Sequence, residues 1–204
     1  MVPKSPPGTV RPSPRERLLA AADELFYADG VQSVGIDRIL ERAGVAKASM
    51  YKAFSGKEEL AAAYLDARHG RIVAEIQAAV YRESDPRARL LAVFDAQARW
   101  ISRPSYRGCA FARASAEATP GGLLQQASNN YRREVLGLLT RLAAEAGVVE
   151  AATLGLQLHL LYNGVALLEA EHPPGLVWAA RSAAETLLDA ALHNREAHPG
   201  RSHQ

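Results

Sequence analysis

From Val31 to Leu60 the chain reads VQSVGIDRILERAGVAKASMYKAFSGKEEL, and this stretch decides the fold. Its first half predicts a short helix with one apolar face. Gly44 then permits a sharp turn, because a residue without a Cβ accepts a positive φ. A second short helix is expected over 47–54, and Ser55 with Glu58 predicts the capped start of a third. Two short helices around such a turn form the helix-turn-helix motif, whose second helix enters the major groove of DNA.

Polar and small side chains on the second short helix are the candidates for contact with DNA. Base edges in the major groove present a distinguishable pattern of donors and acceptors, which lysine, serine and tyrosine side chains can meet. A lysine in the first turn of the next helix opposes the helix dipole unless an anion, such as a DNA phosphate, lies nearby. The expected DNA-binding residues are Lys47, Ala48, Ser49, Tyr51, Lys52 and Lys57. Arg11, Arg15 and Arg17 either touch DNA as well or form a solvated basic start to the first helix.

This run resembles the DNA-binding domain of the TetR/AcrR family of bacterial transcriptional regulators. The matching segments are LFYADGV (25–31), ILERAGVAKASMYKAF (39–54) and SGKEEL (55–60), which cover roughly the first third of the chain. The resemblance implies a dimer formed through the last two long helices and a ligand pocket in the remaining two thirds. It also implies that Tyr51 and Lys57 contact the DNA backbone.

The composition predicts an all-α protein. The chain has 204 residues dominated by helix formers, with little of the alternation that indicates strands. Ser13, Pro14 and Glu16 together predict a capped helix start. We expect about nine helices, arranged as an N-terminal three-helix helix-turn-helix domain followed by a C-terminal ligand-binding and dimerisation bundle. The expected boundaries are a flexible basic arm at 1–12, the DNA-binding domain at 13–57, the helical effector domain at 58–198 and a frayed tail at 199–204.

Several classes of protein are disfavoured by the sequence. The single cysteine, Cys109, allows no internal disulfide and suits a reducing cytoplasm, where we expect the protein. No apolar run approaches the roughly 20 residues needed to cross a membrane, so no membrane partner is expected. A nucleophile elbow, a phosphate loop and a zinc-protease motif are all missing. We therefore expect no catalytic residues, no metal site and no cofactor.

The segment from Ala152 to Leu168 is apolar around most of its circumference. Such a helix must be buried on both sides, so one side is expected to meet its own domain and the other a second chain. The last helix is rich in alanine and can be approached closely. The expected dimer interface is Leu154, Leu158, Leu161, Val165, Ala184, Leu187 and Leu188. The alternative is a bundle that packs only within one chain.

The effector pocket is expected among the helices of the C-terminal domain. Its candidate residues are Ile76, Phe94, Phe111, Tyr131, Leu158, Tyr162 and Asn163. Ordinary core packing is the alternative for each of them. Charged residues are sparse on these stripes, so a small apolar effector is expected. An anionic effector is the open alternative, since Arg99, Arg103 or Arg113 could still meet it.

These observations predict a homodimeric DNA-binding repressor that a small-molecule effector releases from a double-stranded operator. A second hypothesis keeps the DNA-binding function but assigns control to a protein partner or to oxidation of Cys109. A third is a helical interaction module that does not bind DNA. Salt-dependent binding to duplex DNA separates the first two hypotheses from the third.

Overall fold

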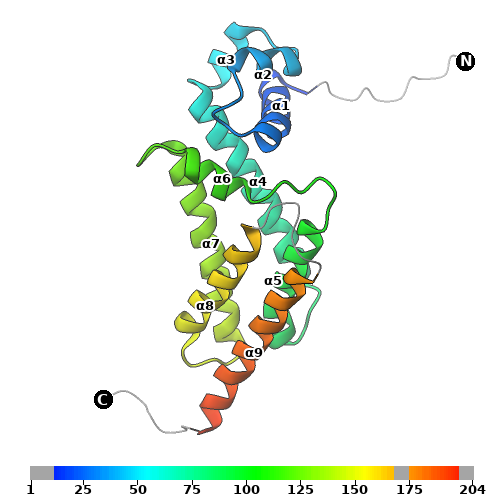
Figure 1. Ribbon diagram of the computed structural model, residues 1–204, viewed down its shortest axis with the longest axis vertical. Helices are drawn as coiled ribbons and strands as arrows, with labels where there is room; N and C mark the ends of the chain where they lie inside the picture. Colours follow the sequence, from blue (N-terminus) through cyan, green and yellow to red (C-terminus); the bar gives the residue numbers. More distant parts are fainter. Residues whose placement is uncertain (1–11, 168–174, 198–204) are drawn as a thin grey trace, which may run out of the picture. The chain divides into compact units, whose positions relative to one another are not determined.

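The computed structural model describes residues 12–167 and 175–197, and within them the chain is all-helical, as predicted. The nine helices of these residues are α1 (Pro14–Asp29), α2 (Ile36–Ala43), α3 (Lys47–Ala53), α4 (Lys57–Val80), α5 (Pro86–Ile101), α6 (Ala110–Glu117), α7 (Leu123–Glu145), α8 (Ala151–Ala166) and α9 (Leu176–Ala197) (Figure 1). None of these helices is long and apolar enough to cross a membrane.

The chain forms two compact units, Met1–Tyr64 and Leu65–Gln204. Helix α4 begins in the first unit and continues through the start of the second. Residues 1–11 of the expected arm and the whole expected tail at 199–204 lie outside the described residues.

Helix α1 begins at the predicted capping box. The Ser13 hydroxyl accepts a hydrogen bond from the Glu16 backbone N–H at 3.2 Å, and the Ser13 N–H donates to Glu16 Oε2 at 2.7 Å. The Ser13 backbone N–H, followed by the Ser13 side chain, lowers the pKa of the Glu16 carboxyl by hydrogen bonding to it. The apolar face of α1 then packs into the core of the first unit. That core includes Leu18, Phe26, Val34, Ile39, Met50, Phe54, Leu60 and Tyr64.

The start of α4 differs from the prediction by one residue. The expected capping pair was Ser55 with Glu58, but the Ser55 N–H donates to Glu59 Oε2 at 2.7 Å. The helix begins at Lys57, so Glu59 is its third residue and occupies the position from which a side chain reaches back. The bonds from Ser55 lower the pKa of Glu59.

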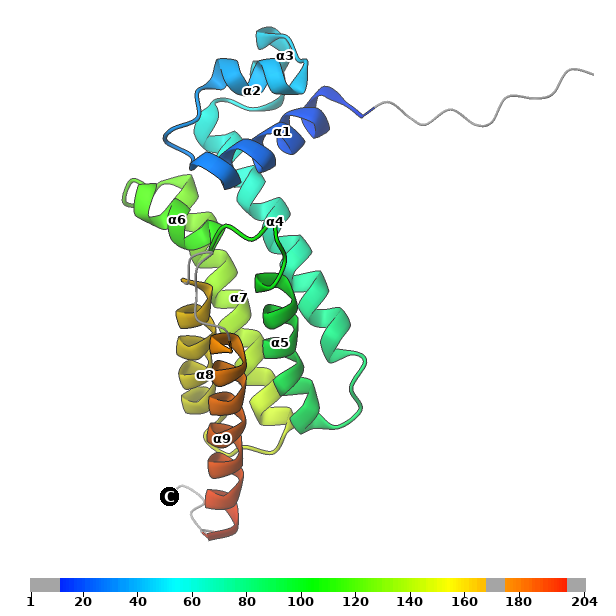
Figure 2. The same ribbon diagram turned by 45° about the vertical axis from the view of Figure 1, so that its right-hand side comes forward.

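The second unit is a helical bundle in which α7 packs on α8, and α9 packs on both α5 and α8 (Figure 2). Helices α7 and α8 approach closely at Gly155, where a Cβ would collide with Thr140. Ion pairs hold α9 on α5: Arg87 makes two hydrogen bonds of 2.9 Å to Asp189, and Arg181 Nε donates to Asp95 at 2.7 Å.

Candidate functional site

The turn of the helix-turn-helix motif has the geometry that its sequence predicts. Gly44 ends α2 in the left-handed region, with φ 60° and ψ 42°. The Gly44 N–H donates to the Glu41 carbonyl at 3.2 Å, and the Val45 N–H donates to the Leu40 carbonyl at 3.1 Å. Val45 is buried, so it fixes the angle at which the chain leaves the turn toward α3.

Arg17 holds this turn from the other side. Its Nη1 donates to the carbonyls of Ala43 and Gly44 at 3.2 and 2.8 Å. Carbonyls at a helix C-terminus lack intrahelical donors, and Arg17 supplies one to the end of α2. Arg15 lies over the ring of Phe54, 5.1 Å from its centroid. Arg15 and Arg17 thus both make contacts within the unit, while Arg11 lies outside the described residues.

Helix α3 presents one face to solvent and buries the other. Met50 is fully buried and Ser49 is half-buried, whereas Lys47, Ala48 and Lys52 are exposed. Tyr51 is 53% exposed, so it does not belong to the core. Within the described residues, Lys47 and Lys52 make no ion pair or hydrogen bond through their ammonium groups. Both charges therefore remain available to an anionic partner.

Lys57 is placed differently from the lysines of α3. It is half-buried, and its Nζ donates to the Gln32 carbonyl at 3.2 Å, which ties the start of α4 to the loop before α2. A DNA phosphate was expected to pair with the free backbone N–H groups at the start of α4. The Glu59 carboxylate already accepts a hydrogen bond from the Ser55 N–H, so one N–H group there is paired within the chain. The remaining protons on Lys57 Nζ can still be donated to a phosphate.

Four of the predicted effector residues come together in the core of the second unit. The rings of Phe111 and Tyr131 are stacked, with centroids 3.9 Å apart and an interplanar angle of 10°. The hydroxyls of Tyr131 and Tyr162 are hydrogen-bonded at 2.9 Å, and Phe94 meets Tyr162 edge-on at 6.4 Å. We call Phe94, Phe111, Tyr131 and Tyr162 the aromatic cluster; one residue comes from each of α5, α6, α7 and α8.

The other predicted effector residues are less clearly part of this cluster. Ile76 and Leu158 are both buried. Asn163 is half-buried, and its Nδ2 donates to His159 Nε2 at 3.1 Å, one turn earlier on α8. Burial lowers the pKa of His159, with a further contribution from Arg132.

Three residues on α5, α6 and α7 that carry buried polar atoms were not among the binding residues predicted from the sequence. Gln97 Nε2 donates to the Tyr162 carbonyl at 2.7 Å, while Gln97 Oε1 has no hydrogen-bond partner. The buried hydroxyls of Ser115 and Ser128 also lack one. A glutamine on the apolar stripe of α5 was the available signal. Buried polar atoms without partners are costly, so a bound molecule that paired with them would be stabilised here.

The aromatic cluster is electrically neutral. Burial raises the pKa of Tyr131 and of Tyr162, so both phenols keep their protons at neutral pH. The cluster therefore offers hydroxyl groups and ring faces, which suit an uncharged ligand better than an anion.

The structure shows how far each residue of the predicted dimer interface is buried within its own chain. Leu154, Leu158, Val165, Ala184 and Leu188 are buried within their own chain, which leaves little of their surface for a second chain. Leu161 and Leu187 are half-buried. Counting apolar residues around α8 did not distinguish the side facing α7 from the side facing outward.

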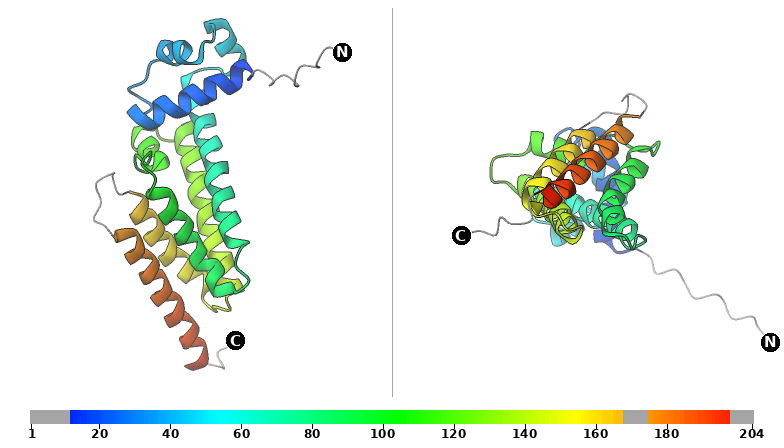
Figure 3. Two further views of the ribbon diagram at one scale, coloured as in Figure 1. Left: turned by 90° about the vertical axis from the view of Figure 1, so that its right-hand side faces the viewer. Right: turned by 90° about the horizontal axis from the view of Figure 1, so that it is seen from below.

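A different set of side chains on α8 and α9 is exposed. The two helices lie side by side, as the left view of Figure 3 shows. Leu156, Leu160 and Gly164 are exposed on α8 and Leu167 directly after it, and Ala179, Ser182, Thr186 and Ala190 are exposed on α9. We call these eight residues the outer face. Leu160 and Leu167 are 73% and 65% exposed, which is unusual for leucines aligned on one helix.

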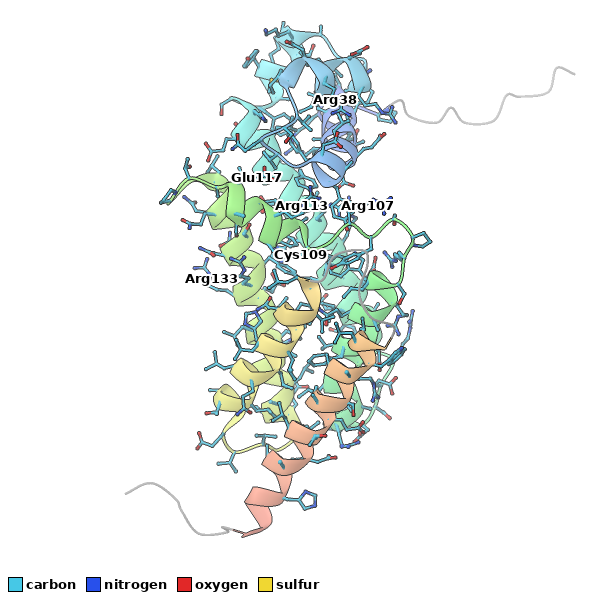
Figure 4. The ribbon with its side chains drawn as sticks, in the orientation of Figure 1. Arg38, Arg107, Cys109, Arg113, Glu117 and Arg133 are labelled. Carbon is cyan, nitrogen blue, oxygen red and sulfur yellow. The ribbon has the colours of Figure 1, made fainter. Side chains whose placement is uncertain are left out.

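Cys109 lies just before α6, with Arg107 before it and Arg113 farther along the helix (Figure 4). The thiol is buried, and this burial raises its pKa. A protonated, buried thiol reacts slowly with oxidants, because the thiolate is the nucleophile. Control by Cys109 oxidation is therefore disfavoured by the structure. No group of His, Cys, Asp or Glu side chains among the described residues could hold a metal ion.

Comparison with known proteins places these features in a family context. The model of the family "Bacterial regulatory proteins, tetR family" matches residues 18–64. The HTH-type transcriptional activator FasR of Mycolicibacterium smegmatis is 37% identical over 91 residues, which are 45% of this chain and 42% of FasR. The HTH-type transcriptional regulator SrpR of Pseudomonas putida is 41% identical over 54 residues, or 26% of this chain and 25% of SrpR. The chain thus spans less than half the length of these curated relatives.

Solved structures match over nearly the whole chain. A TetR-family transcriptional regulator from Streptomyces coelicolor is 33% identical, with a TM-score of 0.82 over 87% of this chain and 95% of that one. A TetR-type transcriptional regulator from Streptomyces avermitilis is 30% identical, with a TM-score of 0.74 over 88% of this chain and 98% of that one.

Proposed function

Because the chain belongs to the TetR family of bacterial transcriptional regulators, we propose that it is a homodimeric repressor that a small-molecule effector releases from its operator. Membership in this family makes the chain a DNA-binding regulator of transcription and not an enzyme. The homodimer, the effector and the repressing action are the parts that this proposal adds.

One observation supports the DNA-binding surface most strongly. Lys47 and Lys52 are exposed on α3, and their charges have no partner within the described part of the chain. The backbone around them is held by Arg17 and by the Gly44 turn. A rigid helix with unpaired cations suits the major groove, where lysine can reach guanine acceptors or phosphates.

The outer face supports the homodimer. In a two-fold dimer the same surface of each chain meets itself, so exposed leucines of α8 would pack on the small residues of α9 in the partner. Such an arrangement would hold two recognition helices about 34–36 Å apart, one turn of DNA. An effector that preferred a different spacing would lower operator affinity in proportion to its preference.

The aromatic cluster supports the effector site. Its neutral phenols, together with the unpaired Gln97 Oε1, favour an uncharged, largely apolar effector that carries one or two hydrogen-bonding groups. The rings contact one another directly, so the effector would have to separate Phe111 from Tyr131 to enter. Separating the two rings would move α6 relative to α7, and this movement would couple effector binding to a conformational change.

The proposal is tested in two steps. Genome-wide footprinting with the full chain would identify the operator, and fluorescence anisotropy would measure affinity for it across a series of salt concentrations. The double variant Lys47→Ala/Lys52→Ala should lose operator preference, whereas Arg141→Ala, an exposed arginine of α7, should not. Unchanged preference in the double variant would show that α3 does not recognise the operator.

The second step concerns control. Compounds suggested by the genes next to the operator would be screened for release of the protein from DNA. A reporter gene would give the sign of regulation, since FasR, one of the relatives, is named an activator. A wild-type chain that stays bound in the presence of every compound, but is released by a protein, would support the alternative of a protein partner.

A further inference from the structure

The arginines of the second unit are nearly all engaged. Arg87, Arg89, Arg103, Arg141 and Arg181 pair with carboxylates, and Arg132 and Arg133 donate to asparagines. Among the arginines of this unit whose side chains the structure describes, Arg82 and Arg99 are those whose guanidinium groups have no hydrogen bond, ion pair or ring contact. Two unpaired guanidinium groups in a unit that pairs its other arginines call for an explanation.

Both unpaired arginines line the same groove. It has a volume of about 320 Å³, and its walls come from the end of α4, the turn after it, the second half of α5 and the turn that follows α5. The lining residues are Glu75, Ala78, Arg82, Ala96, Arg99 and Arg103. We call this hollow the arginine groove. The alanines at positions 78 and 96 leave it open where longer side chains would fill it.

The charge of the arginine groove does not balance. Arg103 is held by Glu75 through two hydrogen bonds of 3.2 and 2.7 Å, which fixes its guanidinium at one end. Arg82 and Arg99 form no ion pair with a carboxylate, and the lining as a whole carries three positive charges and one negative charge, a net +2. A dianion would neutralise this excess. Arginine is the side chain best suited to bind phosphate, because its planar guanidinium presents two parallel N–H groups.

We infer that the arginine groove binds a phosphate group carried by a small molecule, with Arg82 and Arg99 as its ligands and Arg103 as a third, carboxylate-held donor. A phosphate monoester carries a charge of about −1.5 to −2 at neutral pH, which matches the groove. The volume is at the lower end of the range of small-molecule sites, roughly 300–1,000 Å³, so it suits a compact ligand. This site lies on residues other than the aromatic cluster and does not depend on the proposed apolar effector.

A second role for these arginines makes a different prediction. Arg99 lies in the last turn of α5, and Arg82 follows the end of α4, so both could simply offset the negative ends of helix dipoles. In that case their removal would lower the stability of the free protein, and phosphate would have no specific effect on it.

The test measures binding of phosphate to the full chain. Thermal unfolding and isothermal titration calorimetry would use inorganic phosphate and glycerol phosphate, with potassium chloride at matched ionic strength as the reference. Phosphate or its ester should raise the unfolding temperature of the wild type above the chloride reference. The variant Arg82→Gln/Arg99→Gln should bind at least roughly tenfold more weakly, because two charge-assisted contacts are lost. Preference for glycerol phosphate over inorganic phosphate would identify an organic phosphate as the source.

The control removes the same charge from another place. Arg133→Gln/Arg141→Gln, both exposed on α7, should bind phosphate like the wild type. Equal weakening in the two double variants would mean that only net charge matters and would overturn the assignment. It would also be overturned by a wild type that responds equally to phosphate and chloride, or that binds an acidic peptide but not phosphate. Operator binding by α3 is measured separately, so either result leaves the proposed function intact.

Discussion

Leu160→Glu should separate the proposed dimer into folded monomers, whereas Leu158→Glu should unfold the chain. The two leucines are two residues apart on α8 but face opposite ways: Leu160 is 73% exposed and Leu158 is completely buried. A glutamate at 160 is tolerated by the free chain because water solvates it. At 158 it would be a carboxylate in the core without a partner.

The size of the effect follows from the exposed fraction. Complete burial of a leucine side chain contributes about 1.5–3 kcal/mol, so burying the exposed part of Leu160 contributes about 1–2 kcal/mol. A two-fold dimer buries it twice, which gives about 2–4 kcal/mol. Losing this contribution in Leu160→Glu should raise the dissociation constant of the dimer roughly 30-fold to 1,000-fold. Placing two carboxylates in the interface adds a further cost.

Analytical ultracentrifugation at micromolar concentrations would report association, and circular dichroism melting would report stability. Tyr81→Glu provides the control, because Tyr81 is 82% exposed in the turn after α4 and is not part of the outer face. It should leave both measurements unchanged. A Leu160→Glu chain that dimerises as tightly as the wild type would refute the outer face as the interface, and a monomeric wild type would refute the dimer itself.

Three further outcomes follow from single side chains. Arg17→Gln should weaken operator binding by about 1–3 kcal/mol in anisotropy titrations, because the hydrogen bond from Arg17 to the Gly44 carbonyl is lost. Circular dichroism should show α1 intact. Unchanged affinity would show that the turn keeps its geometry without Arg17. Lys57→Ala should weaken binding to all DNA sequences similarly and flatten the salt slope by about one unit, whereas a sequence-dependent loss would assign it a reading role. Cys109 in the native chain should react with a thiol-specific reagent only as fast as local unfolding exposes it, and mass spectrometry would follow the reaction. Rapid labelling would instead support control by oxidation.

The helix-turn-helix was predictable because its determinants are local. A glycine must occupy the left-handed position at residue 44, and the capping box of Ser13 and Glu16 lies within one turn. The contact from Arg17 to the same turn was not predictable, since it joins residues 27 positions apart. Basic residues at the start of a helix give no sign of whether they point to solvent, to DNA or to a neighbouring carbonyl.

The side of α8 that is exposed was not predictable from the sequence, for a related reason. Apolar residues all round α8 show that two sides need cover, but the helical period alone does not say which side faces the core. In the structure Leu154, Leu158 and Val165 are buried, whereas Leu156 and Leu160 are exposed. The outward leucines were visible in the sequence, yet only the packing of α8 on α7 and α9 distinguishes them from the inward ones.

Which charged side chains are unpaired is likewise visible only in the folded chain, and it bears more directly on function. The sequence holds 24 lysines and arginines and a net charge of only +2, which by itself indicates no anionic partner. The fold engages most of the described ones in capping, ion pairs or ring contacts and leaves the ammonium and guanidinium groups of Lys47, Lys52, Arg82 and Arg99 without partners. The first two lie together on the recognition helix and the last two in one groove. Unpaired cations that were merely solvated would be expected to scatter, so their gathering at two places favours two anionic ligands: the DNA backbone or bases at α3, and a phosphate group at the arginine groove.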